Sequence, residues 1–280
     1  MNILRAKSLG FCFGVKKAIK QAEKTKDAST IGPLIHNDDE ISRLQSDFNV
    51  KTLKDVSEIS SEKKAIIRTH GITKEDLAKL QKTDIEIIDA TCPFVKKPQE
   101  IVENMSAQGY EIVIFGDVDH PEVKSVRSYA TTQTYVVLEE EELVGIQFKN
   151  KVAVLSQTTK KVEKFMEIVN FLLLVVKEVR VFNTICDATF RNQRAIKELA
   201  QAADVMIIVG GKSSSNTKQL FLIAKQSCPD SHLIENEDDL DPSWFVGKEN
   251  CGISAGASTP EWIIKKVEMR IEEFKEKGLI

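Results

Sequence analysis

The stretch VMIIVGGKSSSNTKQLF, residues 205–221, joins a short apolar run to a helix-like segment through a turn of glycines and serines. A continuous Val/Ile/Met run of this length is typical of a strand that is buried on both faces. Hydrophobic residues then recur at helical spacing from Thr217. A turn such as GGKSSSN at the start of a helix can bind an anion, although Ser-Ser-Asn runs usually only cap helices. The stretch predicts one strand–turn–helix unit.

The same alternation recurs along the whole chain. Strand-like runs are residues 65–67, 85–88, 112–115, 152–155, 179–182 and 205–209. Helix-like segments between and after them are residues 16–24, 74–82, 98–108, 161–176, 192–202 and 217–227. Buried strands that alternate with helices indicate parallel sheets covered on both faces. The predicted fold class is therefore α/β.

Composition and charge exclude several classes of protein. The chain has 280 residues, is 42% hydrophobic and 29% charged, and carries a formal net charge of −3, so it lacks the basic footprint of a nucleic-acid-binding protein. Its longest purely apolar run, residues 171–176, is far shorter than a membrane span, and no signal peptide is expected at the N-terminus. We expect a cytoplasmic protein that binds neither nucleic acid nor membrane.

Three of the five cysteines stand in equivalent places. Cys12 in GFCFGVKKAI, Cys92 in ATCPFVKKPQEI and Cys186 in TICDATFRNQRAI each follow a strand-like run and precede a helix. An odd number of cysteines makes disulfides the weaker explanation, and metal binding, catalysis or burial the stronger ones. Cys228 and Cys251 fall outside this pattern, and we expect them to be structural.

Two polar loops follow each of the three cysteines at similar distances. The first loops contain His36 in GPLIHN, His120 in GDVDHPEV and the run Ser214, Ser215 and Asn216; the second contain His70 in RTHG, Gln157 and Thr158 in LSQTT, and Ser258 in AGAST. The chain is thus predicted to consist of three related α/β units, residues 1–93, 94–186 and 187–280. Such loops gather at the carboxyl ends of parallel strands, where ligands bind.

Three thiolates around one point would be a ligand set. Zinc prefers a fourth protein ligand in a structural site, whereas a [4Fe-4S] cluster with three cysteines leaves one iron open for chemistry. The long spacing differs from that of zinc ribbons and favours the cluster. The histidines, serines and Asn216 would offer donors to an oxygen-rich anion. Glu122, two residues after His120, is a candidate proton donor, because burial near negative charge would raise its pKa.

Together these motifs carry a family resemblance. The series GFCFGVKKAI, IHN, RTHG, DATCPFV, HPEV, SQTT, NTICDAT, SSN and AGAST resembles the 4-hydroxy-3-methylbut-2-enyl diphosphate reductases, the IspH/LytB family, from residue 3 to about residue 262. The resemblance implies a trefoil of three α/β domains around a [4Fe-4S] cluster. Its ligands would be Cys12, Cys92 and Cys186, with the fourth iron open.

The resemblance also implies a role for each polar residue. The diphosphate would be bound by His36, His70, His120, Ser214, Ser215, Asn216 and Ser258. Glu122 would deliver protons, and His120 and Thr158 would take part in catalysis with it. Thr158, with Gln157 beside it, would bind the substrate in the region of its hydroxyl. The implied reaction reductively removes that hydroxyl and yields isopentenyl and dimethylallyl diphosphate. The implied electron donor is a ferredoxin or a flavodoxin.

Two departures from the family pattern affect only local shape. Ser125 stands where many members carry glycine, and the helix after Cys92 is expected to begin near Lys96-Lys97-Pro98, with an unusual proline.

Two alternative functions remain open from the residues. A cluster-dependent hydro-lyase would need an arginine for a substrate carboxylate, and Arg68 is the only candidate in the polar loops. A non-catalytic iron–sulfur sensor would need a partner-binding or DNA-binding module, and no basic stripe is visible.

Overall fold

The computed structural model describes residues 1–59 and 63–280. Its strands are β1 Asn2–Arg5, β2 Ala28–Ile31, β3 Val50–Leu53, β4 Lys64–Ile67, β5 Glu86–Asp89, β6 Glu111–Phe115, β7 Thr134–Val137, β8 Lys151–Ser156, β9 Glu178–Phe182, β10 Val205–Val209, β11 Ser231–Ile234 and β12 Asn250–Ala255. Its helices are α1 Phe13–Thr25, α2 Asp38–Phe48, α3 Lys74–Leu80, α4 Pro93–Ala107, α5 Pro121–Arg127, α6 Val162–Val175, α7 Asp187–Ala200, α8 Ser215–Ser227 and α9 Glu261–Glu276. Short 3-10 helices are η1 Val56–Glu58, η2 Glu140–Leu143, η3 Glu237–Asp239 and η4 Pro242–Phe245.

The strands form three four-stranded sheets in which all neighbours run parallel. Their orders are β5-β4-β2-β3, β9-β8-β6-β7 and β1-β12-β10-β11. Each sheet therefore has the same pattern, in which the strand that leads to a cysteine lies at one edge and its neighbour leads to a second polar loop. The predicted α/β class with parallel sheets is confirmed.

Strand β10 shows why these sequences form doubly covered sheets. Side chains of successive strand residues point to opposite faces. Val205, Ile207 and Val209 pack in one core with residues of α9, and Met206 and Ile208 pack in another with residues of α7 and α8. All five side chains are fully buried. A run without polar residues is thus explained by two apolar faces.

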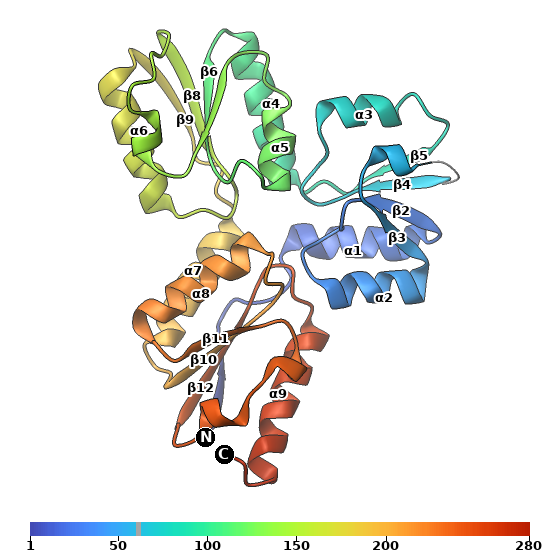
Figure 1. Ribbon diagram of the computed structural model, residues 1–280, viewed down its shortest axis with the longest axis vertical. Coiled ribbons are helices and arrows are strands. Elements are labelled where there is room, and N and C mark those ends of the chain that lie inside the picture. Colours follow the sequence, from blue (N-terminus) through green and yellow to red (C-terminus); the bar gives the residue numbers. More distant parts are fainter. Residues whose placement is uncertain (60–62) are drawn as a thin grey trace. The chain divides into compact units, whose positions relative to one another are not determined.

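Helices cover both faces of the sheet that contains β6 and β8. Helices α4 and α5 lie on one face and α6 on the other (Figure 1). The α4/α5 face is closed by an apolar core that includes Val102, Tyr110, Ile112 and Leu155. Among the described residues, no helix is both long and apolar enough to cross a bilayer.

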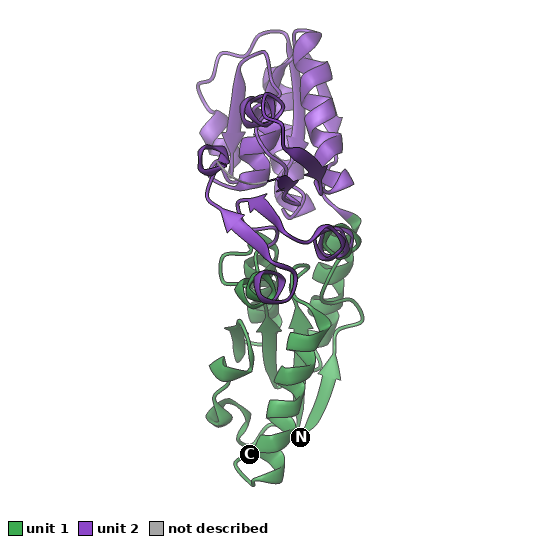
Figure 2. Cartoon of the chain, turned by 90° about the vertical axis from the view of Figure 1, so that its right-hand side faces the viewer, with its two compact units in different colours: residues 1–16, 36–42, 187–280 green, residues 17–35, 43–186 purple. Residues whose placement is uncertain are grey.

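The chain divides into two compact units, residues 1–16, 36–42 and 187–280, and residues 17–35 and 43–186 (Figure 2). The first unit contains the sheet β1-β12-β10-β11, so the first residues of the chain pair with β12 rather than with residues 28–89. The boundaries 1–93, 94–186 and 187–280 stay predictions.

One helix boundary differs from the expectation. Helix α4 begins at Pro93, directly after Cys92, and Pro98 lies buried inside it. Proline is favoured in the first helical turn because its missing N–H would have no helical partner there. The helix therefore starts earlier than Lys96 and places Cys92 at its N-terminus.

Candidate functional site

The three cysteines of the repeat occupy the same local position. Cys92 is the N-cap of α4, and Cys12 and Cys186 stand one residue before α1 and α7. All three are half-buried. The N-terminus of a helix favours negative charge, such as that of a thiolate ligand or a bound anion. The position of each cysteine therefore suits a thiolate that binds a metal.

Each cysteine is also joined to a polar loop by a backbone hydrogen bond. The N–H of Cys12 donates to the carbonyl of Ala257 at 3.1 Å, beside Ser258. The N–H of Cys92 donates to Thr69, beside His70, and that of Cys186 donates to Thr158, both at 3.0 Å. These bonds follow from the sheet order, because the edge strand and its neighbour end side by side. The backbone of each cysteine is thus bonded to a loop that contains a predicted substrate residue, Ser258, His70 or Thr158.

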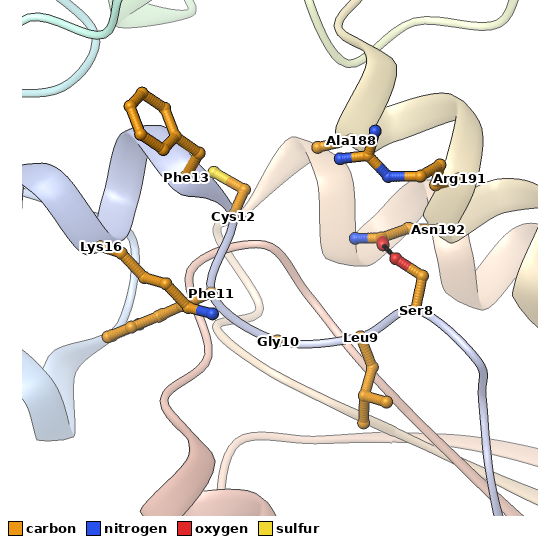
Figure 3. Close-up of a pocket in the computed structure, with 10 residues that line it drawn as sticks. All are labelled: Ser8, Leu9, Gly10, Phe11, Cys12, Phe13, Lys16, Ala188, Arg191 and Asn192. Carbon is orange, nitrogen blue, oxygen red and sulfur yellow. Dashed lines mark hydrogen bonds between the residues drawn. The ribbon is translucent and has the colours of Figure 1, made fainter.

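A cavity of about 310 Å³ opens beside Cys12 in the first unit (Figure 3). Ser8 Oγ donates to Asn192 Oδ1 at 2.6 Å on one of its walls. Lys16 and Arg191 are also among the lining residues. Phe13, directly after Cys12, is 68% exposed.

Glu122 is a buried carboxyl group that accepts two hydrogen bonds from Thr158. It lies in the first turn of α5 and is only 3% exposed. Its Oε1 accepts the N–H of Thr158 and its Oε2 accepts the Thr158 hydroxyl, each at 2.7 Å. Burial raises the pKa of Glu122 to about 7, although the bonds from Thr158 and the charge of Lys160 oppose the shift. A carboxyl with this pKa can give up a proton near neutral pH.

Two histidines lie close together in the second unit. The rings of His70 and His120 meet edge to face with their centroids 5.5 Å apart. His120 caps α5, and its Nδ1 accepts the N–H of Glu122 at 3.1 Å. In the neutral imidazole the proton then lies on Nε2, which can donate to an anion.

Gln157 is buried, and its side chain bonds to neighbouring loop residues. It is 1% exposed, and its Oε1 accepts the N–H of Asp117 at 3.0 Å. Its Nε2 donates to Thr159 Oγ1 at 3.1 Å. Gln157 therefore fixes the loop after β6, which leads to His120.

The first unit brings together the remaining candidates. Ser258 Oγ donates to the carbonyl of His36 at 3.1 Å. A Cβ on Gly211 would lie 2.5 Å from the same carbonyl, so the GGKSSSN turn packs directly against His36. Ser214 caps α8 by accepting the N–H of Thr217 at 3.3 Å, and Ser215 is the first residue of that helix. The loops of His36, Ser214 and Ser258 therefore form one polar cluster.

Asn216 contributes a buried amide to this cluster. Its side chain is 5% exposed, and within the described residues neither its Oδ1 nor its Nδ2 has a hydrogen-bond partner. A buried amide without partners costs free energy, so such groups usually mark a bound ligand, ion or water. Asn216 lies in the first turn of a thirteen-residue helix, where anions bind.

The other two cysteines and His232 lie apart from these groups. Cys228 and Cys251 are buried in apolar cores, and burial raises the pKa of Cys251 to about 12. His232 is partly buried, stacks on Trp244 with centroids 3.8 Å apart and pairs with Asp230.

Comparison with known proteins decides the family. Residues 3–272 match the sequence model described as LytB protein. The chain belongs to the LytB protein family. It is 69% identical to a protein of Campylobacter lari (strain RM2100) over 98% of this chain and 99% of the relative, and 68% identical to one of Campylobacter jejuni (strain RM1221) with the same coverage. Both relatives are named 4-hydroxy-3-methylbut-2-enyl diphosphate reductase.

Two solved structures agree with the fold. One is described as (E)-4-hydroxy-3-methyl-but-2-enyl diphosphate reductase, the terminal enzyme of the non-mevalonate pathway; it has a TM-score of 0.72 and 41% identity over 98% of this chain and all of that chain. The other is the diphosphate reductase of Plasmodium falciparum, with a TM-score of 0.88 over 98% of this chain and 87% of that chain. Its identity is 24%, so this likeness supports the fold alone.

Two residues beside the site were not predicted from the sequence. Lys160 is partly buried and its charge acts on Glu122; burial lowers the pKa of the Lys160 ammonium. Its position directly after Ser-Gln-Thr-Thr could have suggested it. Ser125 is 1% exposed and contacts the loop that carries His70. A buried serine inside an amphipathic helix is a signal of such a contact.

Proposed function

We propose that this chain is a reductase that removes the hydroxyl of (E)-4-hydroxy-3-methylbut-2-enyl diphosphate and forms isopentenyl and dimethylallyl diphosphate. The reaction breaks the allylic C–O bond, takes up two electrons and two protons, and releases water. The observation that carries the proposal is the double link through Thr158, which accepts the N–H of Cys186 and donates twice to Glu122. Cys186, a candidate metal ligand, and Glu122, a candidate proton donor, thus both form hydrogen bonds with Thr158.

The three equivalent cysteines suit an iron–sulfur cluster. We assign Cys12, Cys92 and Cys186 as its ligands, because thiolates are the ligands that such clusters prefer. A [4Fe-4S] cluster would supply the electrons and an open iron that acts as a Lewis acid on the hydroxyl. Cys228 and Cys251 do not take part, since both are buried in apolar cores.

The polar side chains bind the substrate and move the proton. We assign the diphosphate to the polar side chains of the repeated loops, which are His36, His70, His120, Ser214, Ser215, Asn216 and Ser258. Thr158 stands near the substrate hydroxyl, Gln157 positions the loop of His120, and Glu122 gives the proton with which the hydroxyl leaves as water. Binding the diphosphate far from the reacting carbon serves to orient that carbon.

Electrons come from a reduced ferredoxin or flavodoxin, and the enzyme works in the cytoplasm. A reducing compartment is required because cysteines that serve as ligands must not form disulfides.

The position of Arg68 argues against the hydro-lyase alternative. A Cβ on Gly32 would lie 2.5 Å from Arg68 Nη1, so the guanidinium packs directly against the backbone after β2. Burial lowers the pKa of Arg68. Its side chain is occupied within the protein rather than presented to a substrate carboxylate.

An anaerobic assay tests the proposed function. Purified without oxygen, the protein is expected to show cluster absorbance and to consume the hydroxylated diphosphate with reduced methyl viologen. Both products should appear by chromatography after phosphatase treatment. Cluster-loaded protein that leaves this substrate untouched would contradict the proposal.

Asn216→Ala tests the diphosphate site separately. Loss of the buried amide removes hydrogen bonds to the anion, so we expect the inhibition constant of inorganic diphosphate to rise about tenfold. The bound iron should not change. Asn250→Ala, at the amino end of β12, is the matched control, and an equal effect of both substitutions would contradict the assignment.

A further inference from the structure

Ser125 forms a buried bridge between three segments of the second unit. Its Oγ donates to the carbonyl of Ile72 at 2.8 Å and accepts from Gln99 Nε2 at 2.7 Å. The serine lies on α5, Gln99 on α4, and Ile72 in the loop after β4. Ser125 is 1% exposed and Gln99 is 8% exposed, so water does not compete for these bonds.

The loop that this bridge holds is the one that carries His70. Gly71 turns with a φ of +75°, and its N–H donates to Arg68 at 3.0 Å. A Cβ on Gly71 would lie 2.6 Å from Ser125 Oγ and 2.7 Å from Gln99 Nε2. The backbone next to His70 therefore rests directly on the serine hydroxyl.

The other side of the bridge is the helix that begins with His120 and Glu122. Ser125 lies about one helical turn after Glu122 in α5, and both side chains are buried. Ser128, the C-cap residue of α5, adds a more exposed bond, since its Oγ accepts the N–H of Lys74 at 2.9 Å. The bridge thus links the segment of His70 to that of His120.

We propose that Ser125 is a positioning residue that sets the imidazole of His70 against that of His120 for diphosphate binding. The geometric part of this proposal stands on the hydrogen bonds alone; its role in binding rests on the proposed function. Without the hydroxyl, the carbonyl of Ile72 and the amide of Gln99 lose their partner, and the loop of His70 gains freedom. Affinity for the anion falls, because ordering that loop then opposes binding.

The test uses Ser125→Ala and Ser125→Gly in the cluster-loaded enzyme without oxygen. We expect the KM of the substrate and the inhibition constant of inorganic diphosphate to rise about three- to tenfold, the factor of one hydrogen bond, with kcat changed less than about twofold. Ser106→Ala is the matched control: Ser106 is 2% exposed and accepts the N–H of Thr131, away from the His70 loop. Unchanged KM in both variants would overturn the proposal.

A double-mutant cycle separates positioning from general loosening. If Ser125 acts through His70, Ser125→Ala should have no further effect on KM in a His70→Ala background. An equal rise in both backgrounds would show that Ser125 acts elsewhere and would overturn the proposal.

Hydrogen exchange decides the geometric part even if the enzyme fails to use this substrate. Measured by mass spectrometry on the cluster-loaded protein, amides of residues 68–74 should exchange faster in Ser125→Ala than in Ser106→Ala. Equal exchange would overturn the proposal, whereas faster exchange without substrate turnover would reject only the proposed function.

Discussion

Replacement of Cys12 by serine is expected to strip the protein of most of its iron and to abolish measurable turnover. A serine hydroxyl is a poor substitute for the thiolates that hold iron–sulfur clusters. The loss in turnover should exceed the about 10- to 100-fold that follows removal of a group that only supports a metal ligand. Iron and acid-labile sulfide per chain, measured without oxygen, and turnover with reduced methyl viologen check both effects.

Cys228→Ser is the control for this substitution. Cys228 is 4% exposed in an apolar core, where its Sγ donates weakly to the carbonyl of Asp230. The serine should cost some stability and leave the iron content unchanged. A Cys12→Ser protein with the wild-type content of iron would show that Cys12 is not a ligand.

The apolar runs of the sequence predicted strands β4, β5, β6, β8, β9 and β10, and the strands of mixed composition were missed. Strands β6, β8 and β10 were found because their apolar runs are continuous. Strand β2, Ala28–Ile31, is fully buried, but half of its four residues are serine and threonine. Strand β1 could not be placed at all, because its partner β12 lies nearly the whole chain away and no local pattern encodes that pairing.

The sequence predicted which residues belong to the candidate site, but not how they contact one another. Repetition of loops identified the cysteines and the polar side chains, yet it did not show that each cysteine bonds to the loop at the end of the neighbouring strand. That contact depends on strand order, which makes Thr69, Thr158 and Ala257 the backbone partners of the three cysteines. The sequence suggested that Ser125 affects only local shape. Its bonds to Gln99 and Ile72 could not be predicted, because they join segments that are distant in sequence.

Glu122→Gln is expected to lower turnover by about 10²- to 10⁴-fold, the usual contribution of a positioned proton donor. Glutamine keeps an oxygen for the N–H of Thr158 but has no acidic proton to give. The KM of the substrate and the iron content should stay near the wild-type values. Glu111→Gln is the matched control, because Glu111 is also buried, at 4% exposure, and accepts the N–H of Lys149 at 2.6 Å. Unchanged turnover in Glu122→Gln would remove Glu122 from its role.

The pH dependence of kcat tests whether Glu122 acts as a proton donor or as a proton acceptor. Burial raises the pKa of Glu122 to about 7, while Thr158 and the charge of Lys160, the groups that face it, hold the shift back. The acid form therefore dominates below pH 7, and a reaction that needs this proton should be constant at lower pH. Above the pKa, kcat should fall about tenfold for each further pH unit. This decline should be absent from the residual activity of Glu122→Gln. A wild-type profile that instead rises through pH 7 would mean that Glu122 acts in its ionised form and accepts a proton.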